Sequence, residues 1–217
     1  MRILITAGGT REYIDPVRFI SNASSGKMGF ELASEALKSG HEVTLITTVI
    51  RKSRFVNQAK IVRVETAAEM FSEVKKHFKD CDCLIMAAAV ADYTPAKKSK
   101  TKIKKLNNEL IIRLKPTTDI LKWAGKHKKK LQTTRHEPRI VVGFALEDKN
   151  LLENAEKKLK EKNLDIIIAN NISAIGSENS SIYIKTPETA WQKMGEISKK
   201  INAKKIIRLI EKNLKSN

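Results

Sequence analysis

The sequence predicts an α/β fold built on a mostly parallel sheet with helices on both faces. Short apolar runs alternate with longer segments whose apolar residues recur at helical spacing. The strand candidates are almost wholly apolar, which is typical of strands that are buried on both faces. Of the 217 residues 41% are apolar, and no repeat or flexible linker divides them. We therefore expect one domain over residues 1–217 with a substantial core.

The first half of the chain begins with a strand at Arg2–Ala7, followed by a Gly8-Gly9 turn and a polar loop to Ser25. A helix is expected from Gly26 to Ser39, with Gly40 as its C-terminal stop. Its apolar positions recur at helical spacing and predict one buried face: Met28, Phe30, Leu32, Ala33, Ala36 and Leu37.

Three further strands are expected in this half, at Val43–Thr48, Lys60–Val64 and Cys83–Val90. Before the last of them, Thr66 and Glu69 match a capping box, in which the two side chains bond reciprocally to the first turn of a helix. We expect that helix to run to about His77.

The alternation resumes near the C-terminus. Strands are expected at Ile140–Ala145 and Leu164–Ala169, with a helix at Asn150–Lys162 between them. Ser198 is a candidate cap for a last helix. Its inward face would hold Ile201, Ile206, Leu209 and Ile210. Buried strands separated by helices in this way indicate a Rossmann-like, doubly wound sheet.

A different composition separates the two blocks. Residues 92–108 are polar and rich in lysine, and Glu109–Lys115 is predicted to be a strand. Lysine is almost never fully buried. We therefore expect residues 92–115 to project from the sheet as a flap or arm.

The formal net charge is +18, with dense runs at Lys97–Lys105 and Lys126–Lys130. This excess favours anionic partners such as phosphorylated small molecules or nucleic acid. The lysines are spread along the whole chain and few aromatic residues accompany them, which argues against nucleic acid. A non-catalytic nucleic-acid-binding protein that uses the lysine-rich arm stays open as an alternative.

Neither a membrane nor a metal site built by the protein is indicated. The chain has no run of about 18 apolar residues and opens without a signal segment, so we expect a cytoplasmic protein with no membrane partner. Cys81 and Cys83 would point to opposite faces and are expected to be small buried residues. The histidines show no metal-ligand spacing: His41, His77, His127 and His136.

Two glycine clusters, Gly8-Gly9 and Gly26–Gly29, flank the loop after the first strand. Glycine lets backbone N–H groups approach an anion, and a helix N-terminus attracts negative charge. The clusters match neither a P-loop nor the fingerprint of a nicotinamide site, and Val43–Thr48 ends without an acid to hold a ribose. A nicotinamide-dependent reductase is thus a weaker alternative. Each glycine could equally serve a tight turn or close packing.

Asn22, Ser24 and Ser25 precede the helix that begins at Gly26. A serine in such a place is most often an N-cap. Asn22 lies before the expected cap, and its neutral amide could orient a carboxylate or a developing acyl oxyanion.

Six short segments, spread over nearly the whole chain, occur in an order and at a spacing that indicate a protein family. They are Thr6–Thr10 (TAGGT), Asp15–Gly29 (DPVRFISNASSGKMG), Ala88–Tyr93 (AAVADY), Lys102–Lys105 (KIKK), Val142–Ala145 (VGFA) and Ala169-Asn170. With them the chain resembles the phosphopantothenate–cysteine ligase family. The resemblance covers the ligase domain alone. The flavin-binding decarboxylase domain, to which this domain is fused in many bacteria, has no counterpart here.

The resemblance implies a ligase of coenzyme A biosynthesis. The carboxylate of 4′-phosphopantothenate would attack the α-phosphorus of a nucleotide and expel pyrophosphate, and the acyl-nucleotidylate would then form an amide with L-cysteine. The resemblance also implies CTP, with ATP as the alternative, and Mg²⁺. It implies a homodimer in which Lys97–Lys115 helps to form the interface or covers a neighbouring site. Both substrates bring their own nucleophiles, so the enzyme must align them and neutralise phosphate charge.

The resemblance further assigns roles to individual residues. Asn22 matches an asparagine that holds the acyl-nucleotidylate, and Lys102 matches a lysine required for activation, although a lysine run is otherwise typical of a solvated face. Asp92 would bind the ribose or base, and Lys158 and Lys162 the phosphates. All the expected nucleotide contacts are Gly8, Gly9, Ser24, Ser25, Gly26, Lys27, Met28, Ala88, Asp92, Thr118, Asp119, Ile120, Leu121, Phe144, Lys158 and Lys162.

The chain departs from the family pattern in four places. Lys115–Ile120 is one residue longer than the usual K-N-P-D-I, which leaves the register of the nucleotide-contacting turn at Thr118–Leu121 open. Ala145–Asp148 replaces the commoner A-A-E-T, and Ala23 stands where arginine is frequent. The loop Ile172–Ser181 follows the pattern only loosely. These changes concern nucleotide recognition more than acyl transfer, so the choice between CTP and ATP as the nucleotide stays open.

Overall fold

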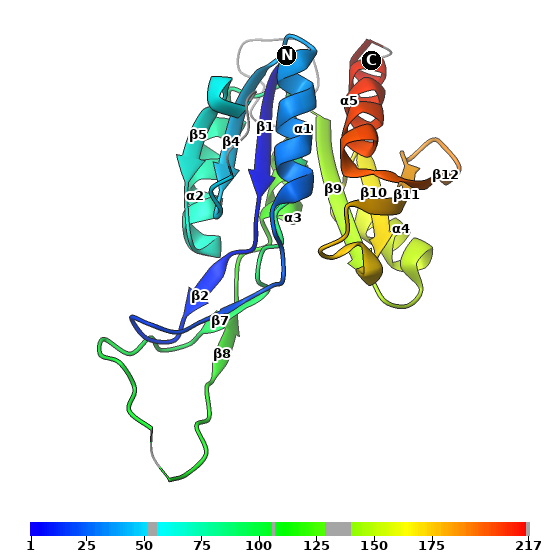
Figure 1. Ribbon diagram of the computed structural model, residues 1–217. Helices are drawn as coiled ribbons and strands as arrows, with labels where there is room; N and C mark the ends of the chain where they lie inside the picture. Colours follow the sequence, from blue (N-terminus) through cyan, green and yellow to red (C-terminus); the bar gives the residue numbers. More distant parts are fainter. Residues whose placement is uncertain (52–55, 106, 129–139, 216–217) are drawn as a thin grey trace.

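An eight-stranded sheet forms the centre of the protein (Figure 1). The computed structural model describes residues 1–51, 56–105, 107–128 and 140–215. Its parallel strands lie in the order β5 (Lys60–Arg63), β4 (Glu42–Thr47), β1 (Arg2–Ala7), β6 (Cys83–Met86), β9 (Ile140–Glu147) and β10 (Ile166–Asn171). Two antiparallel strands, β11 (Asn179–Lys185) and β12 (Gln192–Ser198), extend the sheet beyond β10. The predicted mostly parallel α/β fold is confirmed.

Helices cover both faces of this sheet. They are α1 (Lys27–Lys38) and α5 (Lys199–Lys215) on one face, and α2 (Ala67–Phe78), α3 (Ile120–His127) and α4 (Leu151–Glu161) on the other. Successive residues of β1 enter opposite core clusters, because side chains of a strand alternate between its faces. Ile3 and Ile5 pack with α1 and α5, whereas Leu4 packs with the helices of the other face.

The two cysteines follow the same alternation. Cys83, in β6, is buried in the cluster under α1 and α5, and Cys81 is buried in the opposite cluster. Their predicted role as small core residues on different faces is confirmed. Other predicted features lie outside the described residues, namely His136, Leu106 of the arm, and Lys129 and Lys130 of the second lysine run.

The strand order reverses direction between β1 and β6. From β1 the chain proceeds to β4 and β5 on one side, then crosses to β6, β9 and β10 on the other. In doubly wound sheets a crevice opens at the carboxyl ends of the strands at this point. Here those ends are Ala7 and Met86.

Two predicted strands are shorter than expected. The strand expected at Cys83–Val90 ends at Met86, because the next N–H groups leave the ladder: Ala87 N–H donates to the Ile85 carbonyl (3.2 Å) and Ala88 N–H to the Thr6 hydroxyl (3.2 Å). Pairing with the chain after β1 resumes only as a single bridge at Ala89. Ala89 N–H donates to the Gly8 carbonyl (2.9 Å), and Thr10 N–H donates to the Ala89 carbonyl (3.2 Å). The strand expected at Glu109–Lys115 is confined to β8 (Leu114–Pro116). An apolar run does not by itself show where pairing in a sheet stops.

Two small antiparallel strand pairs lie beyond the carboxyl ends of the central strands. β2 (Arg11–Tyr13) pairs with β3 (Phe19–Ser21), and β7 (Tyr93–Pro95) pairs with β8. The first pair lies within the loop that was expected to be polar and irregular. Figure 1 shows β2, β7 and β8, and the described residues between β7 and β8, extending away from the sheet on the side opposite the two termini.

Three elements differ from the expected turn and loops. α3 replaces the simple turn expected at Thr118–Leu121; Asp119 caps it by accepting a hydrogen bond from Lys122 N–H (2.9 Å). The loop expected over Ile172–Ser181 contains a 3-10 turn at Ile172–Ala174 and then β11, which pairs with β12. A second 3-10 turn lies at Val56–Gln58.

Within the described ranges, no helix has the length and apolar content to cross a bilayer.

The helix ends correct two further expectations. Gly26, and neither Ser24 nor Ser25, is the N-cap of α1. Ser198 does accept a hydrogen bond from Ile201 N–H (3.3 Å), as a cap of α5 would. Ile201 itself is 47% exposed, however, and the buried Asn202 takes the inward place. The burial predicted for the other inward residues is confirmed, because Ile206 and Ile210 are buried and Leu209 packs against the core.

Candidate active site

A cavity of about 620 Å³ opens at the carboxyl ends of the central strands. Its walls come from the loop before α1, the segment after β6, the start of α3, the β9–α4 unit, and the chain from β10 to the start of α5. It therefore occupies the crevice that the strand order indicates. Its size is in the range of sites for small molecules.

Most of the predicted site residues line this cavity. They are Asn22, Ser24, Ser25, Gly26, Lys27, Met28, Ala88, Asp92, Thr118, Asp119, Ile120, Leu121, Phe144, Lys158 and Lys162. Gly8, Gly9 and Lys102 are not among the lining residues. The fold thus brings together side chains that lie far apart in the sequence.

The N-terminus of α1 forms one wall. Gly26 turns the chain into the helix with φ 72°, a left-handed conformation that glycine adopts without strain. The N–H groups of a first helical turn have no partner within the helix, and the N-cap residue, Gly26, has no side chain that could cap them. The hydroxyls of Ser24 and Ser25 accept only long bonds of 3.4 Å, from Gly26 N–H and Lys27 N–H. This helix end is therefore suited to bind an anion.

Gly8 and Gly9 do not line the cavity, but they allow neighbouring segments to pack closely against the end of β1. A Cβ on Gly9 would lie 2.5 Å from the carbonyl oxygen of Asn22, so glycine lets the Asn22 loop pack on the end of β1. A Cβ on Gly8 would collide with the hydroxyl of Thr48. The chain then enters the β2–β3 hairpin rather than a helix, unlike the turn of a nicotinamide site.

Asn22 connects two of the loops that form the cavity. Its side-chain amide nitrogen donates to the carbonyl of Val90 (3.3 Å), which lies in the segment after β6. The backbone carbonyl of Asn22 also accepts a hydrogen bond from Ser24 N–H (2.8 Å). The amide oxygen and one amide hydrogen are then left for a ligand.

A charged cluster lies at the carboxyl end of β9. Lys158 is mostly buried and donates to the carbonyl of Phe144 (2.7 Å); burial, and next the charge of Lys162, lower the pKa of its ammonium. Lys162 forms an ion pair with Asp119 (2.9 Å). Burial opposes ionisation of Asp119, but the hydrogen bonds from Lys162 and Lys122 N–H outweigh it and lower the pKa of that carboxyl. The cluster presents two cations and one anion to a ligand.

Asp92 is fixed in the wall by the backbone around it. Its carbonyl accepts a hydrogen bond from Thr117 N–H (2.8 Å), and the hydroxyl of Thr117 donates to the carbonyl of Ala91 (2.6 Å). The segment after β6 and the approach to α3 therefore form one unit. Ala88 N–H donates to the hydroxyl of Thr6 (3.2 Å), which holds the same segment against β1.

Comparison with known proteins decides the family. A family model for the C-terminal domain of DNA/pantothenate metabolism flavoproteins (DFP) matches residues 1–214. The chain belongs to the DFP C-terminal domain family.

Curated relatives carry the DFP domain as part of a longer chain. The coenzyme A biosynthesis bifunctional protein CoaBC of Borreliella burgdorferi is 41% identical over 211 residues, which cover 96% of this chain and 52% of that protein. CoaBC of Bacillus subtilis is 42% identical over 175 residues, covering 81% and 41%. A cysteine/cysteine sulfinic acid decarboxylase of an unknown prokaryotic organism is 44% identical over 187 residues, covering 84% and 50%. The chain thus spans about half the length of these relatives.

Solved structures match the DFP fold along its length. The crystal structure of the C-terminal domain of CoaBC superposes with a TM-score of 0.83 at 36% identity, covering 100% of this chain and 96% of that one. The DNA/pantothenate metabolism flavoprotein of Streptococcus pneumoniae gives 0.82 at 26% identity, covering 98% and 99%. A Cab2 mutant in complex with phosphopantothenate-cysteine gives 0.75, covering 97% and 86%, and at 19% identity supports the fold alone.

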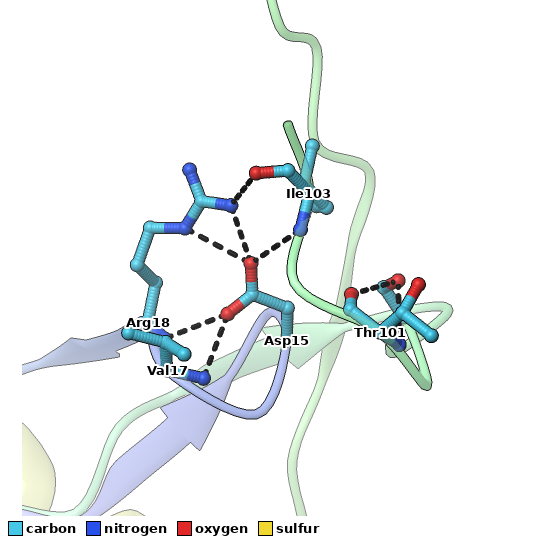
Figure 2. A network of polar contacts seen from close by, with 6 residues as sticks. Asp15, Val17, Arg18, Thr101 and Ile103 are labelled. Carbon is cyan, nitrogen blue, oxygen red and sulfur yellow. Dashed lines mark hydrogen bonds and ion pairs between the residues drawn. The ribbon is translucent and has the colours of Figure 1, made fainter. Parts of the chain in front are cut away.

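Within the DFP domain, one buried carboxylate joins the KIKK segment to the β2–β3 hairpin (Figure 2). Asp15 is fully buried. It accepts hydrogen bonds from the N–H groups of Val17 (2.8 Å), Arg18 (2.8 Å) and Ile103 (3.1 Å), and from the Arg18 guanidinium. That guanidinium also donates to the carbonyl of Ile103 (2.6 Å). The Arg18 guanidinium, helped by the backbone donors against the effect of burial, holds the pKa of Asp15 well below its usual range.

Lys102 lies directly before the anchored Ile103 but outside the cavity of its own chain. Its side chain is exposed. Ser99 N–H donates to the carbonyl of Ile14 (2.9 Å), which ties the same stretch of the arm to the hairpin a second time. The backbone beside Lys102 is therefore held in place, while its ammonium remains in solvent.

Sequence reasoning missed several residues of the cavity wall. Glu147, Asn170 and Lys199 line it, together with Ala174–Gly176. Asn170 belongs to a recognised motif, but no role had been assigned to it. Nothing in the sequence distinguishes Lys199 from the neighbouring Lys200. Only the β11–β12 hairpin, which returns the chain to the cavity, reveals that Lys199 belongs to the site.

The carboxylates of the wall bear on the expected Mg²⁺. They are Asp92, Asp119 and Glu147, of which Asp119 is paired with Lys162. In the described part of the chain, no three His, Cys, Asp or Glu side chains converge on a common point. Magnesium bound with a nucleotide usually takes one or two carboxylates and completes its shell with phosphate oxygens and water. Glu147, which accepts a hydrogen bond from the Asn154 amide (3.1 Å) and has no ion pair within the described residues, is the candidate donor.

Proposed function

We propose that this protein is a phosphopantothenate–cysteine ligase of coenzyme A biosynthesis. The observation that supports this most is the cavity itself, because it unites Asn22, Asp92, Asp119, Lys158 and Lys162 at the switch point of the sheet. The same domain matches the C-terminal domain of CoaBC over its full length. Its substrates would be small, charged molecules, so we also propose a cytoplasmic location.

The first step joins 4′-phosphopantothenate to a nucleotide, for which CTP is proposed and ATP is the alternative. An oxygen of the substrate carboxylate attacks the α-phosphorus, and the bond from that phosphorus to pyrophosphate breaks. Lys158 and Lys162 neutralise the negative charge that moves onto the leaving pyrophosphate. Asp92 holds the ribose or base, and Phe144 contacts the base.

The second step releases the nucleotide. The amine of L-cysteine attacks the acyl carbon, the acyl–oxygen bond breaks, and the nucleoside monophosphate departs with that oxygen. Asn22 orients the acyl group with the part of its amide that Val90 leaves unoccupied. Mg²⁺ bound in the cavity would supply positive charge that offsets the charge of the phosphates, and Glu147 would be a protein donor to it.

We further propose that the protein acts as a homodimer. The arm and the β2–β3 hairpin expose large apolar side chains, among them Val17 at 57%, Tyr93 and Leu110 at 56%, and Ile111 at 82%. Exposed apolar surface of this kind marks an interaction site. Because Lys102 lies outside the cavity of its own chain, the packing of this arm on a second copy would decide which cavity Lys102 serves.

The test is an assay of pyrophosphate release with Mg²⁺, 4′-phosphopantothenate, L-cysteine and either CTP or ATP. We expect release that depends on phosphopantothenate, and 4′-phosphopantothenoylcysteine as a product only when cysteine is present. Asn22→Ala and Lys102→Gln should lower turnover by about 100-fold or more, as loss of a group acting in the transition state does. Lys100→Gln, an exposed lysine of the same run, serves as the control. No release above background with either nucleotide would refute the proposal.

A further inference from the structure

Lys199 is a buried cation on the cavity wall. It is the first residue of α5 and is 7% exposed. Its ammonium donates to the carbonyl of Ala174 (3.0 Å). Burial, and next the charge of Lys27, lower the pKa of Lys199. An ammonium has three donor hydrogens. One carbonyl therefore leaves donor capacity that a ligand in the cavity could use.

Lys27 is a second cation in the same corner. It is the first residue of α1, its side chain is 16% exposed, and it forms an ion pair with Glu178. The side chain of Glu178 is 81% exposed, so its carboxylate is well solvated. Lys199 N–H donates to the carbonyl of Glu178 (3.1 Å), which fixes the backbone of Glu178 beside both lysines. An ion pair with such an exposed partner is weak and can exchange for a better anion.

The charges of this corner do not balance. Lys27 and Lys199 face one exposed carboxylate, and the charge of Arg51 also acts on Lys199. The N-terminus of α1, whose N-cap Gly26 offers no side chain, adds the positive end of its dipole to the same place. A multiply charged anion would relieve the repulsion between the two lysines better than one carboxylate does.

We propose that Lys27 and Lys199, with the N-terminus of α1, form a binding subsite for a phosphate group, and that Glu178 pairs with Lys27 until the phosphate displaces it. The identity of the phosphate rests on the proposed ligase function. The subsite itself would bind inorganic phosphate or pyrophosphate without any reaction. A phosphate has enough charge and acceptor oxygens to engage both ammonium groups.

This subsite differs from the cluster of Lys158 and Lys162. Lys158 lies in α4 and Lys162 is its C-cap, and they already bond to Phe144 and Asp119. Lys27 and Lys199 belong to the helices of the opposite face. The proposed reaction brings two phosphate-bearing substrates, a nucleoside triphosphate and a phosphomonoester. A cavity with two cationic corners fits such a pair.

Calorimetric titration of the ligand-free protein with pyrophosphate and with inorganic phosphate tests the subsite. Lys199→Gln should weaken pyrophosphate binding about tenfold or more, the effect of losing one charge-assisted hydrogen bond. Lys200→Gln, which removes the exposed neighbouring lysine, should bind as the wild type does. Glu178→Gln should bind both anions more tightly, because the competing carboxylate is gone. A gain of this kind cannot come from a misfolded variant.

Steady-state kinetics then identify the phosphate. A higher KM for phosphopantothenate alone in Lys199→Gln assigns its phosphomonoester to the subsite, and a higher KM for the nucleotide assigns the triphosphate; either result supports the proposal. Equal pyrophosphate binding by Lys199→Gln and Lys200→Gln, with no gain in Glu178→Gln, would overturn it. Titration needs no turnover. A protein that binds pyrophosphate through Lys199 but makes no product would therefore refute the proposed ligase and leave the subsite standing.

Discussion

At the scale of single residues, close backbone approach shapes the cavity as much as charge does. A Cβ on Gly125 would collide with the carbonyl of Lys162, and the carbonyl of Gly125 accepts a hydrogen bond from the side chain of Asn163 (2.9 Å). Glycine thus lets α3 dock against the end of α4. That docking places the cap of α3, Asp119, next to Lys162.

Gly29 has the same function between α1 and β1. A Cβ there would lie 2.6 Å from the Cβ of Ala7 and 3.0 Å from the carbonyl of Thr6. Gly29→Ala should therefore push α1 from the sheet and lower the free energy of unfolding by about 1–3 kcal/mol, the usual effect of overpacking. Denaturant unfolding measures it. Gly195→Ala, where an added Cβ meets nothing within 4 Å, is the control. Equal stability of the two variants would contradict this account of Gly29.

Motifs predicted residues of the cavity wall such as Asn22 and Asp92, which lie in segments with a recognisable pattern, and Lys158 followed only from its spacing in the resembled family. Lys199 and Glu178 could not be found in this way. Lys199 resembles the neighbouring Lys200, and only the return of the chain through β11 and β12 brings it to the cavity, while Glu178 is recognised only by its ion pair with Lys27. Their proposed role depends on burial and pairing, which the order of residues does not contain.

At the scale of elements, the position of the arm depends on the β2–β3 hairpin. Asp15 lies in the turn of that hairpin and bonds to the backbone of Ile103, next to Lys102. Asp15→Asn should weaken this attachment and speed amide hydrogen exchange in the stretch around Ile103 at neutral pH. Asp148→Asn, a change at an exposed acid, is the control. Unchanged exchange in Asp15→Asn would show that the arm is held by other contacts.

The same contact predicts a pH dependence of stability. Folding lowers the pKa of Asp15, so its stabilising effect is fully present above the unfolded value of about 3.9 and is lost as the pH falls through the lower folded value. The difference in free energy of unfolding between wild type and Asp15→Asn should therefore stay constant from pH 7 to 5 and shrink in more acidic buffer. A difference that grew on acidification would contradict this reading.

The elements that were predicted have strong local signals. The capping box of Thr66 and Glu69 is present with both hydrogen bonds, and the first strand has its predicted bounds. α3 has eight residues, and strands such as β2 and β7 have three, which is too short for a periodic pattern to stand out. β12 is mostly polar and exposed, so it has no apolar alternation to detect.

At the scale of the whole molecule, alternating buried strands and amphipathic helices predicted the sheet and its two layers of helices. That alternation does not predict dimer formation, because association with a second copy depends on the side chains exposed on the surface. We expect a dimer in sedimentation velocity at micromolar concentration. Ile111→Ser, at the most exposed large apolar residue of the arm (82%), should shift it toward monomer, whereas Ile50→Ser, at a residue that is 74% exposed but away from the arm, should not. A wild-type protein that remains monomeric would refute the proposed dimer.

The central claim is that one cavity activates a carboxylate as an acyl-nucleotidylate and passes it to cysteine. The most direct measurement uses 4′-phosphopantothenate with an ¹⁸O-labelled carboxylate and determines the masses of the products of a single turnover by mass spectrometry. The carboxylate oxygen that attacks the α-phosphorus stays bonded to that phosphorus when the amine of cysteine displaces the nucleoside monophosphate from the acyl carbon. The nucleoside monophosphate should therefore carry one ¹⁸O atom and the pyrophosphate none. An unlabelled monophosphate, or labelled inorganic phosphate beside a nucleoside diphosphate, would contradict the account.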